Sequence, residues 1–199
     1  MPGVIRVRSA HGYTMVELMA VVAIIAVASA VTLPVTSRTL GDLRLRADAN
    51  AVANSVALAK MRATSAFSRA RLFVDLSTDS YFIQVWNKVD EVWETEGGSV
   101  ETSDGVTFGY GSLTAPPPNT QLAINQSPEC DDDGGVPIEQ TACVTFNSRG
   151  IPIDNAGAPT GNNALYLTDG SAVYVTTLTA TPLVRLWWSP GNVAAWVQQ

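Results

Sequence analysis

An apolar run near the N-terminus is the strongest feature of the hydropathy pattern. It covers 21 residues, Tyr13–Leu33, and Glu17 is the only charged residue within it. A helix of this length is about 31 Å long, which matches the roughly 30 Å hydrocarbon core of a bilayer. The leader before it carries Arg6, Arg8 and His11 and no acidic residue. The positive-inside rule therefore predicts a cytoplasmic N-terminus and a single membrane crossing.

A second helical pattern follows Pro34, where a kink or local break is expected because proline removes a backbone hydrogen bond. Apolar residues then recur every three or four positions, at Leu45, Ala49, Val52, Val56, Ala59, Ala63 and Phe67. No glycine or proline interrupts Asp42–Arg71. The spacing predicts a long amphipathic helix over that range, with an apolar stripe suited to packing on a sheet.

Short segments rich in β-branched and aromatic residues follow the helical pattern and predict strands. We expect strands at Arg71–Leu76, Tyr81–Trp86, Val89–Trp93, Val106–Tyr110, Ala142–Phe146, Ala164–Thr168, Ala172–Thr177, Leu183–Trp188 and Val193–Val197. Turn signals separate several of them, and Ala115–Asn119 and Ser127–Pro137 have the composition of exposed loops. The predicted fold is α+β: a long N-terminal helix, membrane-spanning in its first half and amphipathic in its second, packed on a mainly antiparallel β-sheet head.

The formal net charge of −6 combines two regions of opposite charge. Pro34–Arg71 contains seven basic and two acidic residues, a net charge of +5. Leu72–Gln199 contains fifteen acidic residues and three basic ones, Lys88, Arg149 and Arg185, a net charge of −12. An acidic head repels phosphate backbones, which argues against nucleic acid as its main ligand.

Cys130 and Cys143 both lie in this acidic head. Translocation would place them in an oxidising compartment, where a disulfide is the first interpretation and two unpaired thiols are the alternative. Without histidine neighbours the pair makes a poor metal site.

The residues around Glu17 resemble the class III signal of type IV pilins and pseudopilins. Gly12, an aromatic residue, a threonine, two apolar residues and Glu17 open the apolar run, and Pro34 closes it. The departures from the usual pattern are small: Tyr13 in place of Phe, Met15 in place of Leu, and His11 in place of Lys or Arg.

The resemblance implies processing followed by assembly. In that family a membrane prepilin peptidase cuts after the glycine, here Gly12, and methylates the new terminal amine, here on Tyr13. Glu17 then takes the family's acidic position, the fifth, and pairs with the terminal amine of a neighbouring subunit. A carboxylate that is costly in a bilayer, by about 2.5–3.5 kcal/mol on insertion scales, would thereby acquire a partner.

The head resembles the GspH/FimT group of minor pseudopilins and minor pilins, through the strand pair after the helix, the segment Cys143–Gly150 and a closing hairpin. The resemblance implies a non-enzymatic subunit of a type II secretion pseudopilus, without cofactor or metal, anchored in the inner membrane with its head in the periplasm. Its partners would be other pilin-like subunits, the prepilin peptidase and the secretion platform. A FimT-like minor pilin of a type IV pilus, in pilus assembly or DNA uptake, is the alternative. The expected parts are a leader (1–12), a membrane helix (13–33), a stem helix (34–71) and a head (72–199).

A secretory signal peptide and an enzyme are the alternatives to this interpretation. A secretory signal peptide cut after Ala28-Ser29-Ala30 is the alternative for the N-terminus, but the long run and Glu17 argue against it. An enzyme is not expected, because His11 is the only histidine and lies in the leader, and no phosphate loop or nucleophile elbow is present. Paired carboxylates in the head leave that alternative open.

Three features of the head have two interpretations each. The acidic segment Glu129–Gly135, which includes Asp131–Asp133, is a solvated loop or a calcium site without EF-hand spacing. DNA binding would depend on Arg149 and Arg185, the two basic residues of the C-terminal half. The tryptophans pack in the β core or form a platform for a carbohydrate or aromatic ligand; they are Trp86, Trp93, Trp187, Trp188 and Trp196.

Overall fold

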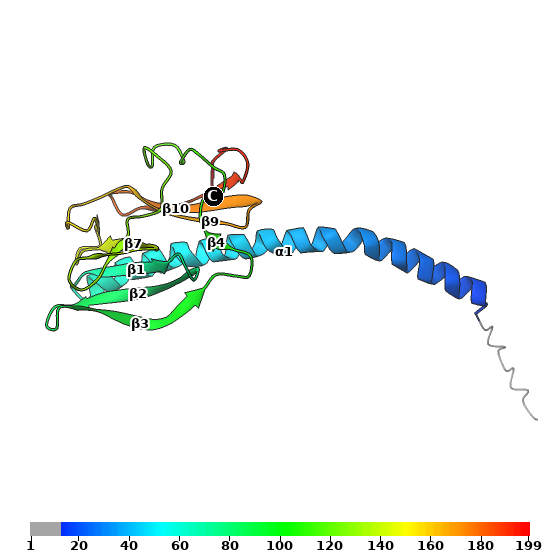
Figure 1. Ribbon diagram of the computed structural model, residues 1–199, viewed down its shortest axis with the longest axis horizontal. Helices are drawn as coiled ribbons and strands as arrows, with labels where there is room; N and C mark the ends of the chain where they lie inside the picture. The colour runs from blue at the N-terminus through cyan, green and yellow to red at the C-terminus, as the bar shows by residue number, and fades with distance from the viewer. Residues whose placement is uncertain (1–12) are drawn as a thin grey trace, which may run out of the picture. The chain divides into compact units, whose positions relative to one another are not determined.

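The computed structural model describes residues 13–199, and the side chains of residues 30–38 lie outside that description. A single long helix, α1 (Met15–Ser65), precedes the strands β1 to β12 (Figure 1). The chain divides into two compact units, Met1–Leu40 and Gly41–Gln199. The strand pairings within the described residues are antiparallel, so the predicted α+β fold with an antiparallel head is confirmed.

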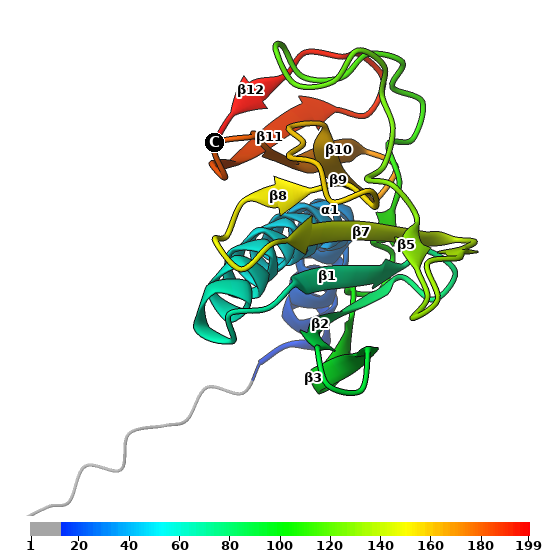
Figure 2. The same ribbon diagram turned by 90° about the vertical axis from the view of Figure 1, so that its left-hand side faces the viewer.

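Two five-stranded sheets form the β part of the second unit (Figure 2). The first sheet has the order β3 (Val92–Glu101), β2 (Ser80–Asn87), β1 (Ala70–Asp75), β7 (Thr141–Phe146) and β8 (Pro152–Ile153). The second sheet has the order β12 (Val197–Gln198), β11 (Val184–Pro190), β10 (Ala172–Leu178), β9 (Asn163–Thr168) and β4 (Thr107–Phe108). A short ribbon pairs β5 (Cys130–Asp131) with β6 (Pro137–Ile138).

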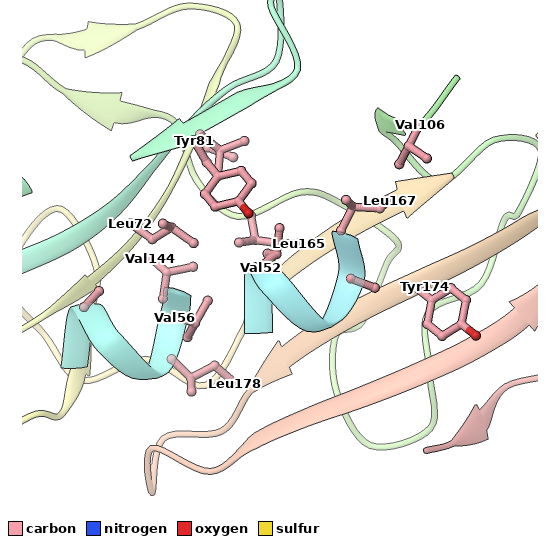
Figure 3. Packing of buried hydrophobic residues seen from close by; sticks show 14 of the residues in the cluster. Val52, Val56, Leu72, Tyr81, Val106, Val144, Leu165, Leu167, Tyr174 and Leu178 are labelled. Carbon is pink, nitrogen blue, oxygen red and sulfur yellow. The ribbon is translucent and has the colours of Figure 1, made fainter. Parts of the chain in front are cut away.

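Residues 41–65 of α1 lie between the two sheets, and their apolar stripe forms the centre of the core (Figure 1). Six stripe residues are at most 1% exposed: Leu45, Ala49, Val52, Val56, Ala59 and Ala63. Val52 and Val56 belong to one cluster with Leu72 of the first sheet and Leu165 of the second (Figure 3). The sequence predicted this stripe correctly, but it did not show that sheets cover the helix on two sides.

The helix ends at Ser65, and its predicted extension to Arg71 is wrong. Backbone hydrogen bonds across residues 63–68 close a Schellman cap, in which Phe67 has the left-handed φ of 49°. This conformation turns the chain out of the helix, so Phe67 is 75% exposed instead of continuing the buried stripe. Arg71 therefore lies in β1.

The strand predicted at Val89–Trp93 begins later, at Val92. The Asn87 side chain accepts hydrogen bonds from the backbone N–H groups of Val89 and Asp90, and this holds residues 88–91 in a turn. Such bonds let an asparagine compete with strand pairing for the same backbone donors.

Two further predictions in the head were wrong in part. The expected loop Ser127–Pro137 contains β5 and the first residue of β6. The expected strand Val193–Val197 is reduced to β12, because Ser189 Oγ donates to the Val193 carbonyl and accepts from Ala195 N–H. This hydroxyl therefore removes two backbone groups that a strand would use.

Within the described residues, no helix combines the length and the apolarity that crossing a membrane requires. The membrane span predicted for residues 13–33 stays a prediction. Helical backbone continues through Pro34, and the kink predicted there likewise stays a prediction.

A disulfide joins Cys130 of β5 to Cys143 of β7. This bond links the two-stranded ribbon of β5 and β6 to the first sheet. Backbone bonds reinforce this attachment, because Cys143 N–H donates to the Pro128 carbonyl and Cys130 N–H donates to Thr141 Oγ1.

Removing this disulfide by the paired change Cys130→Ser and Cys143→Ser is expected to lower the free energy of unfolding by about 3 kcal/mol. The physical reason is the unfolded-state entropy that returns when a loop of 13 residues is opened. Urea unfolding of the variant and of the oxidised protein measures the difference. Wild type under reducing conditions serves as the matched control and should resemble the variant. Equal stability of oxidised and reduced protein would contradict the expectation.

Candidate functional site

The first turn of α1 holds Glu17 through a reciprocal pair of contacts with Thr14. Thr14 precedes the helix, and its Oγ1 accepts a hydrogen bond from Glu17 N–H at 3.2 Å. In return, Glu17 Oε2 accepts from Thr14 N–H at 2.9 Å and from the Thr14 hydroxyl at 3.0 Å. This arrangement is a capping box, which satisfies backbone donors that a helix start otherwise leaves unpaired.

The capping box also fixes the direction of the carboxylate, because it draws Glu17 back toward the start of the helix. Both bonds from Thr14 end on Oε2, and Oε1 accepts no hydrogen bond from any described residue. Oε1 is therefore available to a second donor. The spacing Thr14-x-x-Glu17 is a sequence signature of a capping box. This spacing could have predicted the capping role of Thr14, although only Glu17 was singled out from the sequence.

Apolar side chains surround this carboxylate on the helix surface. Large residues between positions 15 and 27 are 53–82% exposed, and they include Met15, Val16, Leu18 and Met19. A helix that is apolar on all sides is stable only when a bilayer or other protein covers it. The helix surface therefore requires a partner that the chain does not supply among its described residues.

Of the other N-terminal residues singled out from the sequence, the structure describes Tyr13. Tyr13 lies two positions before the first residue of the helix and is 87% exposed. Gly12, after which cleavage is predicted, lies outside the described residues. The cleavage, the methylation and the assembly role of Glu17 are therefore proposals.

The carboxylates of the acidic loop, Glu129–Gly135, do not converge on a single point. Asp132 Oδ1 accepts from the backbone N–H groups of Gly134 and Val136, so this side chain shapes the turn. Asp133 Oδ1 accepts instead from Trp93 N–H in β3 at 2.8 Å. Among the described residues no group of three metal-ligating side chains converges. The calcium interpretation therefore gains no support from this geometry.

Trp188 of β11 is half-buried and packs against the main core, and the other four tryptophans fall into two groups. Trp187 is buried and donates from Nε1 to Thr177 Oγ1 at 3.0 Å, and Trp196 donates to the Ala115 carbonyl at 2.9 Å. These two residues pack at the outer side of the second sheet. Trp86 and Trp93 form a cross-strand pair in the first sheet, with ring centroids 5.2 Å apart.

The two arginines considered for DNA binding are not equally accessible. Arg149 is exposed, in the turn after β7, whereas Arg185 is half-buried in β11. A single exposed arginine in the C-terminal half is a weak basis for contacts with a phosphate backbone.

The N-terminal turn lies in a segment that matches a known protein family. Residues 7–33 match the family described as "Prokaryotic N-terminal methylation motif". The N-terminal segment of the chain therefore carries this methylation motif. This segment contains Gly12, Tyr13 and Glu17.

Two solved structures similar to the chain are of the minor pseudopilin EpsH from the type 2 secretion system of Vibrio cholerae. The first is 11% identical, with a TM-score of 0.46, over 72% of this chain and 95% of that one. The second is 13% identical, with a TM-score of 0.44, over 74% of this chain and 94% of that one. No curated protein sequence shows a significant match to the chain.

Proposed function

We propose that the protein is a minor pseudopilin, a non-enzymatic structural subunit of a type II secretion pseudopilus that acts in filament assembly and protein export. The observation that supports it most is the methylation motif over residues 7–33, together with the placement of Glu17 in the first turn of an exposed apolar helix. The GspH-like assignment of the head is part of this proposal.

The apolar helix has two environments in this proposal. Before assembly it anchors the protein in the bacterial inner membrane, with the N-terminus in the cytoplasm and the head in the periplasm. After assembly the same surface is buried against the helices of other subunits. Both environments remove the exposed apolar side chains from water, which is the physical requirement that the helix surface sets.

Glu17 favours the assembled filament over the membrane-embedded subunit. In a bilayer its charge is unpaired and costly, whereas a neighbouring subunit can supply a terminal amine as counter-ion. Oε1 accepts no hydrogen bond from the described residues, so that amine can bind there without breaking the capping box. The terminal amine becomes available only after the leader is removed, which couples assembly to processing.

Processing is expected to produce a mature chain that begins with N-methylated Tyr13. Mass spectrometry of the protein purified from membranes identifies its first residue and the methyl group. A change at the predicted cleavage site, Gly12→Val, should leave the leader attached, and Ala28→Val serves as a control that should be processed normally. A mature chain beginning at Val31 would instead indicate a secretory signal peptide.

The methylation motif fits the FimT-like alternative equally well. A separate experiment therefore has to distinguish a type II secretion pseudopilus from a type IV pilus. Deletion of the gene in the native bacterium is expected to abolish export of type II substrates and to leave type IV pili on the cell surface. Culture supernatants and electron microscopy of the same cells give the two measurements. Lost pili with normal export would replace the proposal by the alternative.

A further inference from the structure

A small pocket lies on the outer face of the first sheet. Its cavity of about 110 Å³ is lined by residues of β1, β2, β3, β7 and β8 together with the acidic loop, Asp154 and Asn155. Alternate residues of a strand point to opposite faces, so β1 directs Leu72 toward the helix and Arg71 into the pocket. The cavity is smaller than the roughly 150 Å³ that encloses a benzene ring, so a ring-sized group would enter it only in part.

The most deeply buried charged group in this pocket is the guanidinium of Arg71, which is 3% exposed. Its Nε donates to Gln84 Oε1 at 2.8 Å, and its Nη1 donates to the Asp131 carbonyl at 2.7 Å. Its Cζ lies 4.0 Å from the centroid of the Trp93 ring. Nη2 donates to no described residue and is not sealed from solvent, so it can donate to an occupant of the pocket.

This donor keeps its charge under physiological conditions. Burial lowers the pKa of Arg71 to about 10, against the opposing effect of Asp131 and Asp133. A pKa near 10 leaves the guanidinium protonated at neutral pH. An occupant of the pocket with an acceptor oxygen can therefore form a charge-assisted hydrogen bond with this guanidinium.

The rim of the pocket supplies acceptors in fixed positions. Asp131 Oδ1 accepts from Asn155 Nδ2, Asp133 Oδ1 accepts from Trp93 N–H, and Asp154 Oδ1 accepts from Ala158 N–H, each at 2.8 Å. In each case Oδ2 accepts no hydrogen bond from the described residues. The orientation of these carboxylates is therefore set before any ligand arrives, which lowers the ordering cost of binding.

The charges around the cavity restrict the ligand. Two arginines and four aspartates line it, so carboxylates at the rim repel an anion and the guanidinium of Arg71 repels a cation. A neutral ligand with adjacent donors and acceptors satisfies both groups at once. Hydroxyl groups have both functions, and Trp86 and Trp93 add apolar walls beside them.

We propose that this pocket binds one ring of a neutral saccharide, whose hydroxyl oxygens accept from Arg71 and whose hydroxyl protons are donated to the rim carboxylates. The remaining sugar rings would extend into solvent. The site is separate from the filament-forming helix and does not depend on the proposed function.

Saccharide binding can be measured through the tryptophan emission of the full-length protein, to which Trp86 and Trp93 contribute, in a detergent without a sugar headgroup. Diacetylchitobiose and maltose serve as probes, which separates amino-sugar glycans from hexose glycans. We expect a saturable change in emission with at least one of them. Arg71→Lys should weaken this binding at least about tenfold, because lysine cannot reproduce the fixed geometry of the guanidinium.

Asp131→Asn provides a second test that preserves the local structure, because Oδ1 still accepts from Asn155. It turns an acceptor at the rim into a donor and should weaken binding about fivefold or more. Asp104→Asn, at an exposed aspartate outside the pocket, is the matched control and should bind as wild type does. The proposal is overturned if neither saccharide gives a saturable change, or if binding survives both Arg71→Lys and Asp131→Asn. It is also overturned if calcium or acetate alone reproduces the change.

Discussion

Replacing Glu17 by alanine is expected to leave the protein in the membrane and to abolish its incorporation into filaments. Membrane retention should persist because the substitution removes the one charged side chain of the apolar run. Assembly should fail because the terminal amine of the neighbouring subunit then stays buried without a counter-ion. Breaking one half of a buried ion pair costs about 3–5 kcal/mol, which corresponds to roughly 10²–10⁴-fold in an association constant.

The measurement separates these two steps. Membrane fractionation reports insertion, and immunoblotting of sheared or purified filaments reports incorporation. Thr14→Val is a matched control, because it removes the hydroxyl of the capping box and retains the carboxylate. Loss of the cap should cost about 0.5–2 kcal/mol at the helix start, so this variant should still assemble, at a reduced level. Normal incorporation of the Glu17→Ala variant would contradict the assembly role of Glu17.

Replacing Val56 by aspartate is expected to unfold the head. Val56 is 1% exposed and lies in the core between the two sheets, in one cluster with Leu72 and Leu165 (Figure 3). The substitution loses about 1.5–3 kcal/mol of apolar burial and adds the larger cost of an unpaired buried charge. These terms together approach the 5–15 kcal/mol of stability typical of a folded domain.

Near-ultraviolet circular dichroism and limited proteolysis report whether the head is folded. Leu58→Asp introduces the same charge two positions further along the same helix, at a side chain that is 45% exposed. This control should keep the native signal and lose little stability. If the two variants were equally stable, residues 41–65 of α1 would not lie between the sheets as the structure places them.

The candidate site at the N-terminus could be predicted because its contacts are local. Thr14 and Glu17 are three positions apart, and their bonds depend on the helix geometry of a single turn. The same holds for the turn between β1 and β2, where Asp75 Oδ1 accepts from the Ser77 hydroxyl and its backbone N–H. These hydrogen bonds hold the pKa of the Asp75 carboxyl below its ordinary value.

The pocket of the head could not be predicted in this way, because its contacts join distant parts of the chain. Arg71 reaches the Asp131 carbonyl across 60 positions, and Trp93 N–H reaches Asp133 across 40. From the sequence, Arg71 was expected both at the end of the stem helix and at the start of the strand Arg71–Leu76, and the structure places it in β1. Because the chain leaves the helix at the Schellman cap around Phe67, Arg71 lies in β1. Successive side chains of a strand point to opposite faces, and Arg71 points away from the core.

The sequence by itself determined the methylation motif, the apolar run with Glu17, the stripe from Leu45 to Ala63 and the α+β class. Each depends on spacing within one segment, because helix and strand periodicities are properties of local backbone geometry. Only the tertiary structure decided that two sheets enclose the helix and that Arg71 and the acidic loop form one pocket. A periodic pattern identifies which face of a segment is apolar, whereas the elements that cover that face depend on contacts between residues far apart in the chain.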